Sequence, residues 1–198
     1  MTHSALVLCA DGTEEIECVV IVDVLRRANI RVVLASASAS RRVQCSRGVV
    51  LEADVLLDEV DAVTEFDAIV LPGGMGGAKA FASSARVHQL LAQYYSSSSK
   101  VVAAVCAGPI AFKPSGIAQN KNITSHPSVK QQLMVEGDSP WFASYSEERV
   151  VVDGRLVTSR GPGTCFEFAL KIVELLSGAQ VVDEVAKPMM LHPAIHSE

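Results

Sequence analysis

The sequence predicts a doubly wound α/β domain with a mostly parallel sheet. Short apolar runs recur along the chain, each followed by a turn or a helical segment, and this alternation is typical of strand–helix–strand units. The mean hydropathy is +0.29, which favours strands buried on both faces. The 198 residues contain no internal repeat and no linker-like stretch, so we expect a single domain over residues 1–198.

Composition excludes several classes of protein. Hydrophobic residues make up 49% of the chain and charged residues 20%, as in an ordinary globular domain and unlike a disordered chain. The formal net charge of −5 gives none of the basic character of a nucleic-acid-binding protein. No apolar run reaches the roughly 18 residues of a membrane span. We therefore expect neither a membrane nor a nucleic acid as partner.

The five cysteines are odd in number, widely spaced and include no CxxC pair. This pattern argues against a disulfide framework or a zinc ribbon and favours free thiols in a reducing compartment. The first residues lack the basic stretch of a secretory signal. We expect a cytoplasmic protein that works without a metal ion or another cofactor.

The N-terminal segment predicts a strand–helix–strand unit. Residues 4–10 are apolar and precede a turn signal, so they are expected to form a buried strand. Thr13 is suited to cap a helix that reaches about residue 28, with acidic groups in its first turn and arginines in its last. Residues 31–37 predict the second strand, parallel to the first.

The later elements follow from the same patterns. Apolar runs predict strands, Arg47-Gly48 and Asp153-Gly154 mark hairpin turns, and helical spacing of apolar residues predicts helices. Strands are expected at residues 43–46, 49–53, 68–71, 100–105, 150–153 and 155–159. Helices or helical turns are expected at residues 56–63, 85–95, 107–112, 127–135, 164–176 and 181–187.

Three of the expected strands end next to residues that can do chemistry. Residues 11–17, residues 73–77 and Cys106 each follow directly after a strand. In doubly wound sheets, ligands gather at the carboxyl ends of the strands. We therefore expect these three segments to converge on one crevice.

Cys106 lies in the segment AVCAGP, where an apolar strand ends and a helical turn is expected to begin. Small neighbours permit the sharp turn of a nucleophile elbow. The N-terminus of the following helix would stabilise a thiolate, and nearby backbone amides would stabilise a developing oxyanion. A buried structural cysteine is the alternative interpretation of the same pattern.

The other two segments offer a carboxyl group and free backbone amides. Glu17 has apolar neighbours in its helix, so it could stay protonated in a crevice and donate a hydrogen bond to a thiolate. The alternative interpretation is that Glu17 is a first-turn glutamate that stabilises the helix through its dipole. Gly73 and Gly74 leave backbone N–H groups exposed after a strand, which suits an oxyanion. On spacing alone a tight turn is favoured there.

His126 precedes an expected helix and could pair with Cys106, although a surface histidine fits the sequence as well. Cys45 lies in the expected hairpin, where we expect it to be exposed or at an interface. No group of histidine, cysteine and acidic residues has metal-ligand spacing.

Eight segments carry a resemblance to a known family. They are DGTEEIE at 11–17, VDVLRRA at 22–28, VQCSRGV at 43–49, VLPGG at 70–74, CAGP at 106–109, SHP at 125–127, LVTSRGPGT at 156–164 and FEFAL at 166–170. In this order and at these spacings they show that the chain resembles the ThiJ/PfpI superfamily, in its Parkinsonism-associated deglycase branch. The resemblance covers essentially the whole chain.

The resemblance implies a flavodoxin-like sandwich, related to the class I glutamine amidotransferases, and a homodimer. It implies that Cys106 is a nucleophile in a strained elbow, that Glu17 is the protonated carboxyl beside it, and that His126 is the third member of the site. The oxyanion pocket would be formed by the backbone amides of Gly73, Gly74 and Ala107. A C-terminal helix typical of the branch is expected within residues 181–190.

The main functional hypothesis is a cofactor-independent deglycase or glyoxalase. It would act through Cys106 on methylglyoxal, glyoxal and early glycated protein side chains, and oxidation of Cys106 would protect against oxidative stress. The alternative is a redox sensor or chaperone without significant catalysis, with Cys106 and Cys45 as oxidation-sensitive thiols. A cysteine peptidase or amidase ranks last, because it needs a well-aligned pair of Cys106 and His126.

Some positions depart from the pattern of the family. Asn29 stands where a glycine is usual, Met75-Gly76 differ from the residues expected after the paired glycines, and Pro114 should stop a helix early. These departures bear on the shape of the entrance and on substrate preference. Residues 192–198 form an extension to which no function is assigned.

Overall fold

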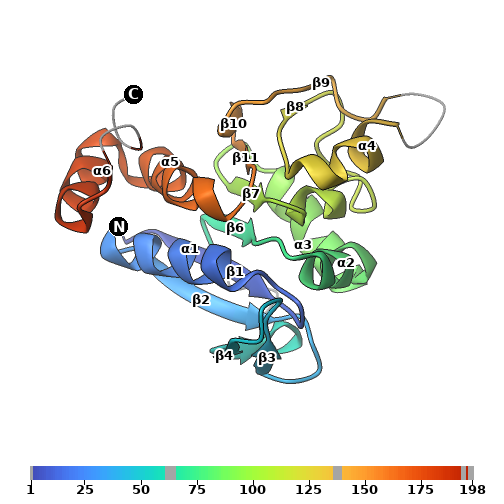
Figure 1. The fold of residues 1–198 in the computed structure, drawn as a ribbon, viewed down its shortest axis with the longest axis horizontal. Helices are drawn as coiled ribbons and strands as arrows, with labels where there is room; N and C mark the ends of the chain where they lie inside the picture. Colours follow the sequence, from blue (N-terminus) through green and yellow to red (C-terminus); the bar gives the residue numbers. More distant parts are fainter. Residues whose placement is uncertain (1, 61–65, 136–139, 193–194, 196–198) are drawn as a thin grey trace.

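The structure, a computed structural model, describes residues 2–60, 66–135, 140–192 and 195. Within these residues, seven strands form a sheet with the order β10-β11-β7-β6-β1-β2-β5, in which β10 is antiparallel to β11 and the other neighbours are parallel. The strands of this sheet are β1 (Ser4–Cys9), β2 (Arg31–Ser36), β5 (Val55–Leu56), β6 (Ala68–Leu71), β7 (Val101–Val105), β10 (Val150–Asp153) and β11 (Leu156–Ser159). The predicted mostly parallel α/β sheet is confirmed (Figure 1).

Helices cover both faces of the sheet. They are α1 (Glu15–Arg27), α2 (Met75–Ser83), α3 (Ala85–Tyr95), α4 (Pro127–Val135), α5 (Cys165–Ser177) and α6 (Ala179–Ala186). Side chains of β1 alternate between two cores because successive residues of a strand point to opposite faces. Ala5 and Val7 pack in the core that contains α1, α5 and α6, whereas Leu6 and Leu8 pack in the core that contains α2 and α3.

The carboxyl ends of β1, β6 and β7 meet at one edge of the sheet, because these three strands are parallel neighbours. The segments that follow them are therefore brought together, as the sequence predicts. The hairpin of β3 (Arg42–Gln44) and β4 (Val50–Glu52) closes over the first of these segments. The Gly12 N–H donates to the carbonyl of Gln44 at 2.8 Å, and the Gln44 N–H donates to the carboxylate of Asp11 at 2.9 Å.

Helix α2 was not expected from the sequence, because Gly76 and Gly77 disfavour a helix interior. The structure shows why glycine stands there. A Cβ on Gly76 would lie 2.9 Å from the carbonyl oxygen of Asp11, and one on Gly77 would lie 2.4 Å from Oγ1 of Thr13. The first turn of α2 thus packs directly on the loop after β1, and close backbone contact outweighs helix propensity.

The start of α1 also differs from the prediction. Glu14, and not Thr13, caps the helix by accepting a hydrogen bond from the Glu17 N–H at 2.8 Å. Thr13 is fully buried, and its Oγ1 accepts from the Ala10 N–H at 2.9 Å. Thr13 therefore stabilises the loop between β1 and α1, two residues before the helix begins at Glu15.

Short elements account for the remaining differences. The strands β8 (Asn122–Ile123) and β9 (Ser144–Tyr145) form a parallel pair that the sequence does not reveal, because two residues carry no periodic pattern. The turn expected at residues 56–63 is a 3₁₀ turn, η1 (Leu57–Glu59), and residues 61–65 lie outside the described part of the chain. The 3₁₀ turn η2 (Gly108–Ala111) replaces the helix expected after Cys106.

The C-terminal helix is present as α6, followed by the 3₁₀ turn η4 (Lys187–Met189). Figure 1 shows α6 beside α5 at one end of the molecule, away from α2. Most of the extension at residues 192–198 lies outside the described residues. Among the helices that the structure describes, none is both long enough and apolar enough to span a membrane.

Candidate active site

Cys106 lies immediately after β7 with φ of 62°, in the left-handed region that non-glycine residues rarely adopt. Its backbone is held on both sides: the N–H donates to the Ser159 carbonyl at 3.0 Å, and the carbonyl accepts from the His126 N–H at 2.9 Å. Strain of this kind persists only where surrounding contacts enforce it. The chain therefore makes a sharp elbow at Cys106, and its side chain is only partly buried.

Glu17 reaches this elbow from α1. The side chain is fully buried, and Oε2 accepts a hydrogen bond from the Gly73 N–H at 2.6 Å. Among the described residues, Oε1 has no hydrogen-bond partner of its own. A buried carboxylate oxygen without a donor is costly, so this arrangement favours the protonated form of Glu17.

Gly73 lies between these two side chains. A Cβ on this residue would lie 2.5 Å from Cβ of Cys106, 2.7 Å from Oε2 of Glu17 and 2.9 Å from the nitrogen of Ala107. Only a residue without a side chain lets the thiol and the carboxyl approach one another here. Because the Gly73 N–H already donates to Glu17, that amide serves the carboxyl in this structure.

The two ionisable groups influence one another. Burial raises the pKa of the Glu17 carboxyl from 4.5 to about 7, although hydrogen bonds from Gly73 and from the Cys106 thiol act in the opposite direction. Burial and the negative charge of an ionised Glu17 raise the pKa of Cys106 from 9.0 to about 12, whereas the N–H groups of Gly74 and Ala107 lower it. Burial is the larger cause for Cys106, and the charge of Glu17 adds to it only when that carboxyl is ionised.

A protonated Glu17 reverses the effect on the thiol. It carries no negative charge to oppose the thiolate, and its O–H can donate a hydrogen bond to the sulfur, so the contribution of Glu17 then lowers the pKa of Cys106 against the effect of burial. Each group is among the causes of the other's pKa shift, so the two titrations are coupled. The thiolate is most favoured when the residue 17 side chain is neutral and can donate a hydrogen bond, while Gly74 and Ala107 also donate to the sulfur.

His126 borders the elbow but faces another partner. Its Nδ1 accepts from the Ser128 N–H at 3.2 Å and lies 2.7 Å from Oγ of Ser128, so the neutral ring carries its proton on Nε2. Its Cδ2 lies 3.6 Å from the position of a Cβ on Gly161. Among the hydrogen bonds of the described residues, none joins the imidazole to Sγ of Cys106. A hydrogen-bonded Cys–His dyad is therefore absent in this conformation.

Cys45 is 5% exposed, which corrects the expectation of an exposed thiol in the hairpin of a single chain. Burial and the nearby Glu15 carboxylate raise its pKa to about 11. Cys9, Cys18 and Cys165 are also buried, and burial raises the pKa of each. Cys106 is the most accessible of the five thiols.

Three residues contribute to the site without having been predicted. Ser159 fixes the N–H of Cys106, Ser128 orients the imidazole of His126, and Glu14 both caps α1 and adds negative charge near Glu17. Ser159 ends β11 and meets Cys106 only in the fold, whereas Ser128 lies in α4, two residues after His126. Across the part of the chain that the structure describes, no group of three or more histidine, cysteine or acidic side chains is arranged to hold a metal ion.

The profile of the DJ-1/PfpI family matches residues 3–175. The chain belongs to this family. It is 44% identical to Protein dj-1beta of Drosophila melanogaster over 191 residues, which are 96% of this chain and 98% of the relative. The crystal structure of Drosophila melanogaster DJ-1beta superposes with a TM-score of 0.90, covering 97% of this chain and all of that one.

A second relative carries an activity in its name. The protein named glutathione-independent glyoxalase DJR-1.2, from Caenorhabditis elegans, is 39% identical over 189 residues, which are 95% of this chain and 96% of that relative. At least one relative of this chain thus carries the name of a glyoxalase. The resemblance seen in the sequence is confirmed at the level of the family and of its fold.

Proposed function

We propose that this chain is a glutathione-independent glyoxalase that uses Cys106 as its nucleophile. The observation that carries the proposal is the contact between a strained, accessible cysteine and a buried carboxyl whose pKa lies near 7. A group that titrates near the working pH can both give and take a proton. The relative named a glyoxalase supports the same reaction class.

The proposed reaction begins when the Cys106 thiolate attacks the aldehyde carbon of methylglyoxal. A carbon–sulfur bond forms, the carbonyl becomes an alkoxide, and a proton gives the hemithioacetal. Glu17 removes the proton from the former aldehyde carbon and returns one to the neighbouring carbon through an enediol, which leaves a thioester. Water cleaves the thioester to lactate and free thiol; glyoxal gives glycolate in the same way.

The backbone amides of Gly74 and Ala107 donate toward the sulfur, so a carbonyl attacked by that sulfur would lie close to them. They are the proposed donors for the alkoxide, and Gly73 contributes by fixing the carboxyl of Glu17. His126 is proposed to assist proton transfer through Nε2 after a change of its ring orientation. The same attack on early glycated cysteine, lysine or arginine side chains would make the chain a deglycase.

The test is lactate formation from methylglyoxal without glutathione, for the wild type and for Cys106→Ser. Cys165→Ser is the matched control, because Cys165 is a buried thiol outside the site and a serine can still donate to the Gly161 carbonyl. The proposal predicts activity in the wild type and in Cys165→Ser and loss of activity in Cys106→Ser. Equal rates for wild type and Cys106→Ser would exclude it. Glycated N-acetyl-lysine in place of methylglyoxal tests the deglycase reaction.

A second function, sensing of oxidants, is favoured by the same donors. A sulfinate on Cys106 would accept hydrogen bonds from protonated Glu17 and from the amides of Gly74 and Ala107. Intact-mass measurement after mild peroxide treatment should therefore find two added oxygens on Cys106. Preferential oxidation of the buried Cys45 or Cys165 would count against a sensor at this site.

We propose a homodimer that uses the outer face of α1 and the β3–β4 hairpin. Ile16 and Val19 on α1 are 52% and 49% exposed, and Val49 and Val50 at the hairpin are 48% and 46% exposed. Such neighbouring apolar groups are costly to leave in water. Val50→Lys should convert the dimer to a monomer in sedimentation experiments, whereas Val152→Lys, at the 41% exposed position on β10, should not.

A further inference from the structure

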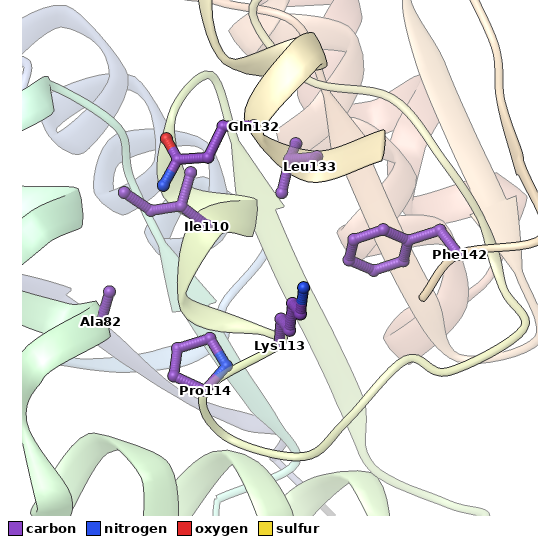
Figure 2. Close-up of a pocket in the computed structure, with 7 residues that line it drawn as sticks. All are labelled: Ala82, Ile110, Lys113, Pro114, Gln132, Leu133 and Phe142. Atoms are coloured by element: carbon purple, nitrogen blue, oxygen red, sulfur yellow. The ribbon is translucent and has the colours of Figure 1, made fainter. Parts of the chain in front are cut away.

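A cavity outside the candidate active site lies between α2, α4 and the segment that follows η2. Its volume is about 350 Å³, within the usual range for small-molecule sites. None of Cys106, Glu17 and His126 lines it. The lining residues, shown in Figure 2, are Ala82, Ile110, Lys113, Pro114, Gln132, Leu133 and Phe142.

The walls of this cavity combine an apolar surface with two polar groups. Ile110, Leu133 and Phe142 are 7%, 4% and 1% exposed, so they form a buried apolar base whose remaining exposed atoms face the cavity. Figure 2 shows the ring of Phe142 pointing toward the other lining side chains, with the Lys113 nitrogen directed to the same space. Lys113 and Gln132 thus provide a cationic and an amide donor beside an apolar surface.

The chain around the cavity is held in place by its own hydrogen bonds. Pro114 cannot extend the helical turn η2, and Oγ of Ser115 donates to the Ala111 carbonyl at 2.7 Å, which fixes the turn that bears Lys113. On the opposite wall, Nε1 of Trp141 donates to the Ile117 carbonyl at 2.8 Å and secures the segment that bears Phe142. A site that is already formed loses little conformational entropy on binding.

We propose that this cavity binds a small amphiphilic carboxylate, such as a medium-chain alkanoate. The apolar chain would pack on Ile110, Leu133 and Phe142, and the carboxylate would accept hydrogen bonds from the Lys113 ammonium and the Gln132 amide. An ammonium has three N–H donors, so Lys113 can serve a ligand in addition to a contact within the protein. Charge-assisted hydrogen bonds beside an apolar surface select an anion with an apolar tail over either part alone.

Titration calorimetry with octanoate tests the proposal, with octan-1-ol as the uncharged probe of similar length. Octanoate should bind the wild type at one site, and Lys113→Met should weaken it by about tenfold because the charge-assisted bond is lost. Lys113→Met should leave octan-1-ol binding unchanged. Ala82→Leu, at a half-exposed lining position on α2, should abolish the binding of both probes by filling the cavity.

Three controls separate this site from the rest of the surface and from the proposed active site. Lys79→Met removes an exposed lysine on α2 and Ala92→Leu enlarges an exposed alanine on α3; both should bind octanoate like the wild type. Cys106→Ser should also bind it normally, whether or not Cys106 supports glyoxalase activity. No binding to the wild type, equal binding by Lys113→Met, or loss of binding in Cys106→Ser would overturn the proposal.

Discussion

Replacing Glu17 by glutamine should remove a pH dependence that this buried carboxyl gives to the stability of the fold. In the folded chain the pKa of Glu17 is about 7, against 4.5 for an ordinary glutamate. Between these pH values the folded state holds a proton that the unfolded state has released. The contribution of the protonated carboxyl is therefore complete below the unfolded pKa and is lost as the pH rises through about 7.

The difference between 4.5 and about 7 corresponds to a loss of about 3 kcal/mol in the free energy of unfolding. The side chain is fully buried, so solvent screening reduces this figure little. Glutamine keeps an oxygen that accepts from the Gly73 N–H and carries no proton that titrates in this range. The variant should therefore fold with similar packing while losing the pH-dependent contribution.

The assay is urea unfolding of wild type and Glu17→Gln at about pH 4.5 and about pH 8.5. The free energy of the wild type minus that of the variant should fall by about 3 kcal/mol between the two pH values. Subtraction cancels other groups, such as Asp153, whose pKa is lowered by the Asn122 N–H and Lys121. Glu52→Gln, at a side chain that is 77% exposed, should change little. A difference that stays constant within about 0.5 kcal/mol would refute the reasoning.

Three further predictions concern the backbone, two of them at the site and one at Asn29, in the connection between α1 and β2. Cys106→Gly should be about 1 kcal/mol more stable than Cys106→Ala in urea unfolding, because φ is 62° there; equal stabilities would show an unstrained elbow. Asn29→Ala should lose about 1 kcal/mol while Asn29→Gly stays near the wild type, because φ of Asn29 is 55°; an unaffected alanine variant would contradict this. Gly73→Ala should slow both iodoacetamide labelling of Cys106 and methylglyoxal conversion by about a hundredfold, because the new alanine Cβ would lie 2.5 Å from Cβ of Cys106. A normal labelling rate in this variant would show that the site adapts.

The sequence allowed the buried strands and the convergence of their ends to be predicted, because apolar runs and turn residues are local signals. It also placed Cys106 at a strand end with small neighbours. Asn29 illustrates what a single departure can mean: its left-handed φ explains why a glycine is usual at this position and why asparagine is tolerated. At the strands, at Cys106 and at Asn29, the residue type and its immediate neighbours indicate the local backbone conformation.

Other features depend on contacts between distant segments. Helix α2 could not be predicted, because Gly76 is required by the approach of the Asp11 carbonyl and not by the helix. The donation of the Gly73 N–H to Glu17 joins two distant segments, and no local pattern specifies it. Ser128 is only two residues from His126, but the sequence does not reveal which way the imidazole turns. The burial of Cys45 likewise arises when its hairpin folds onto the loop after β1.

The most direct test of the proposed chemistry compares two rates in Glu17→Gln: alkylation of Cys106 by iodoacetamide and glutathione-free formation of lactate from methylglyoxal. If Glu17 moves protons for a Cys106 nucleophile, the variant should keep Cys106 alkylation within about tenfold of the wild type and lose lactate formation by at least about a hundredfold. Lactate formation at the wild-type rate in this variant would contradict the account.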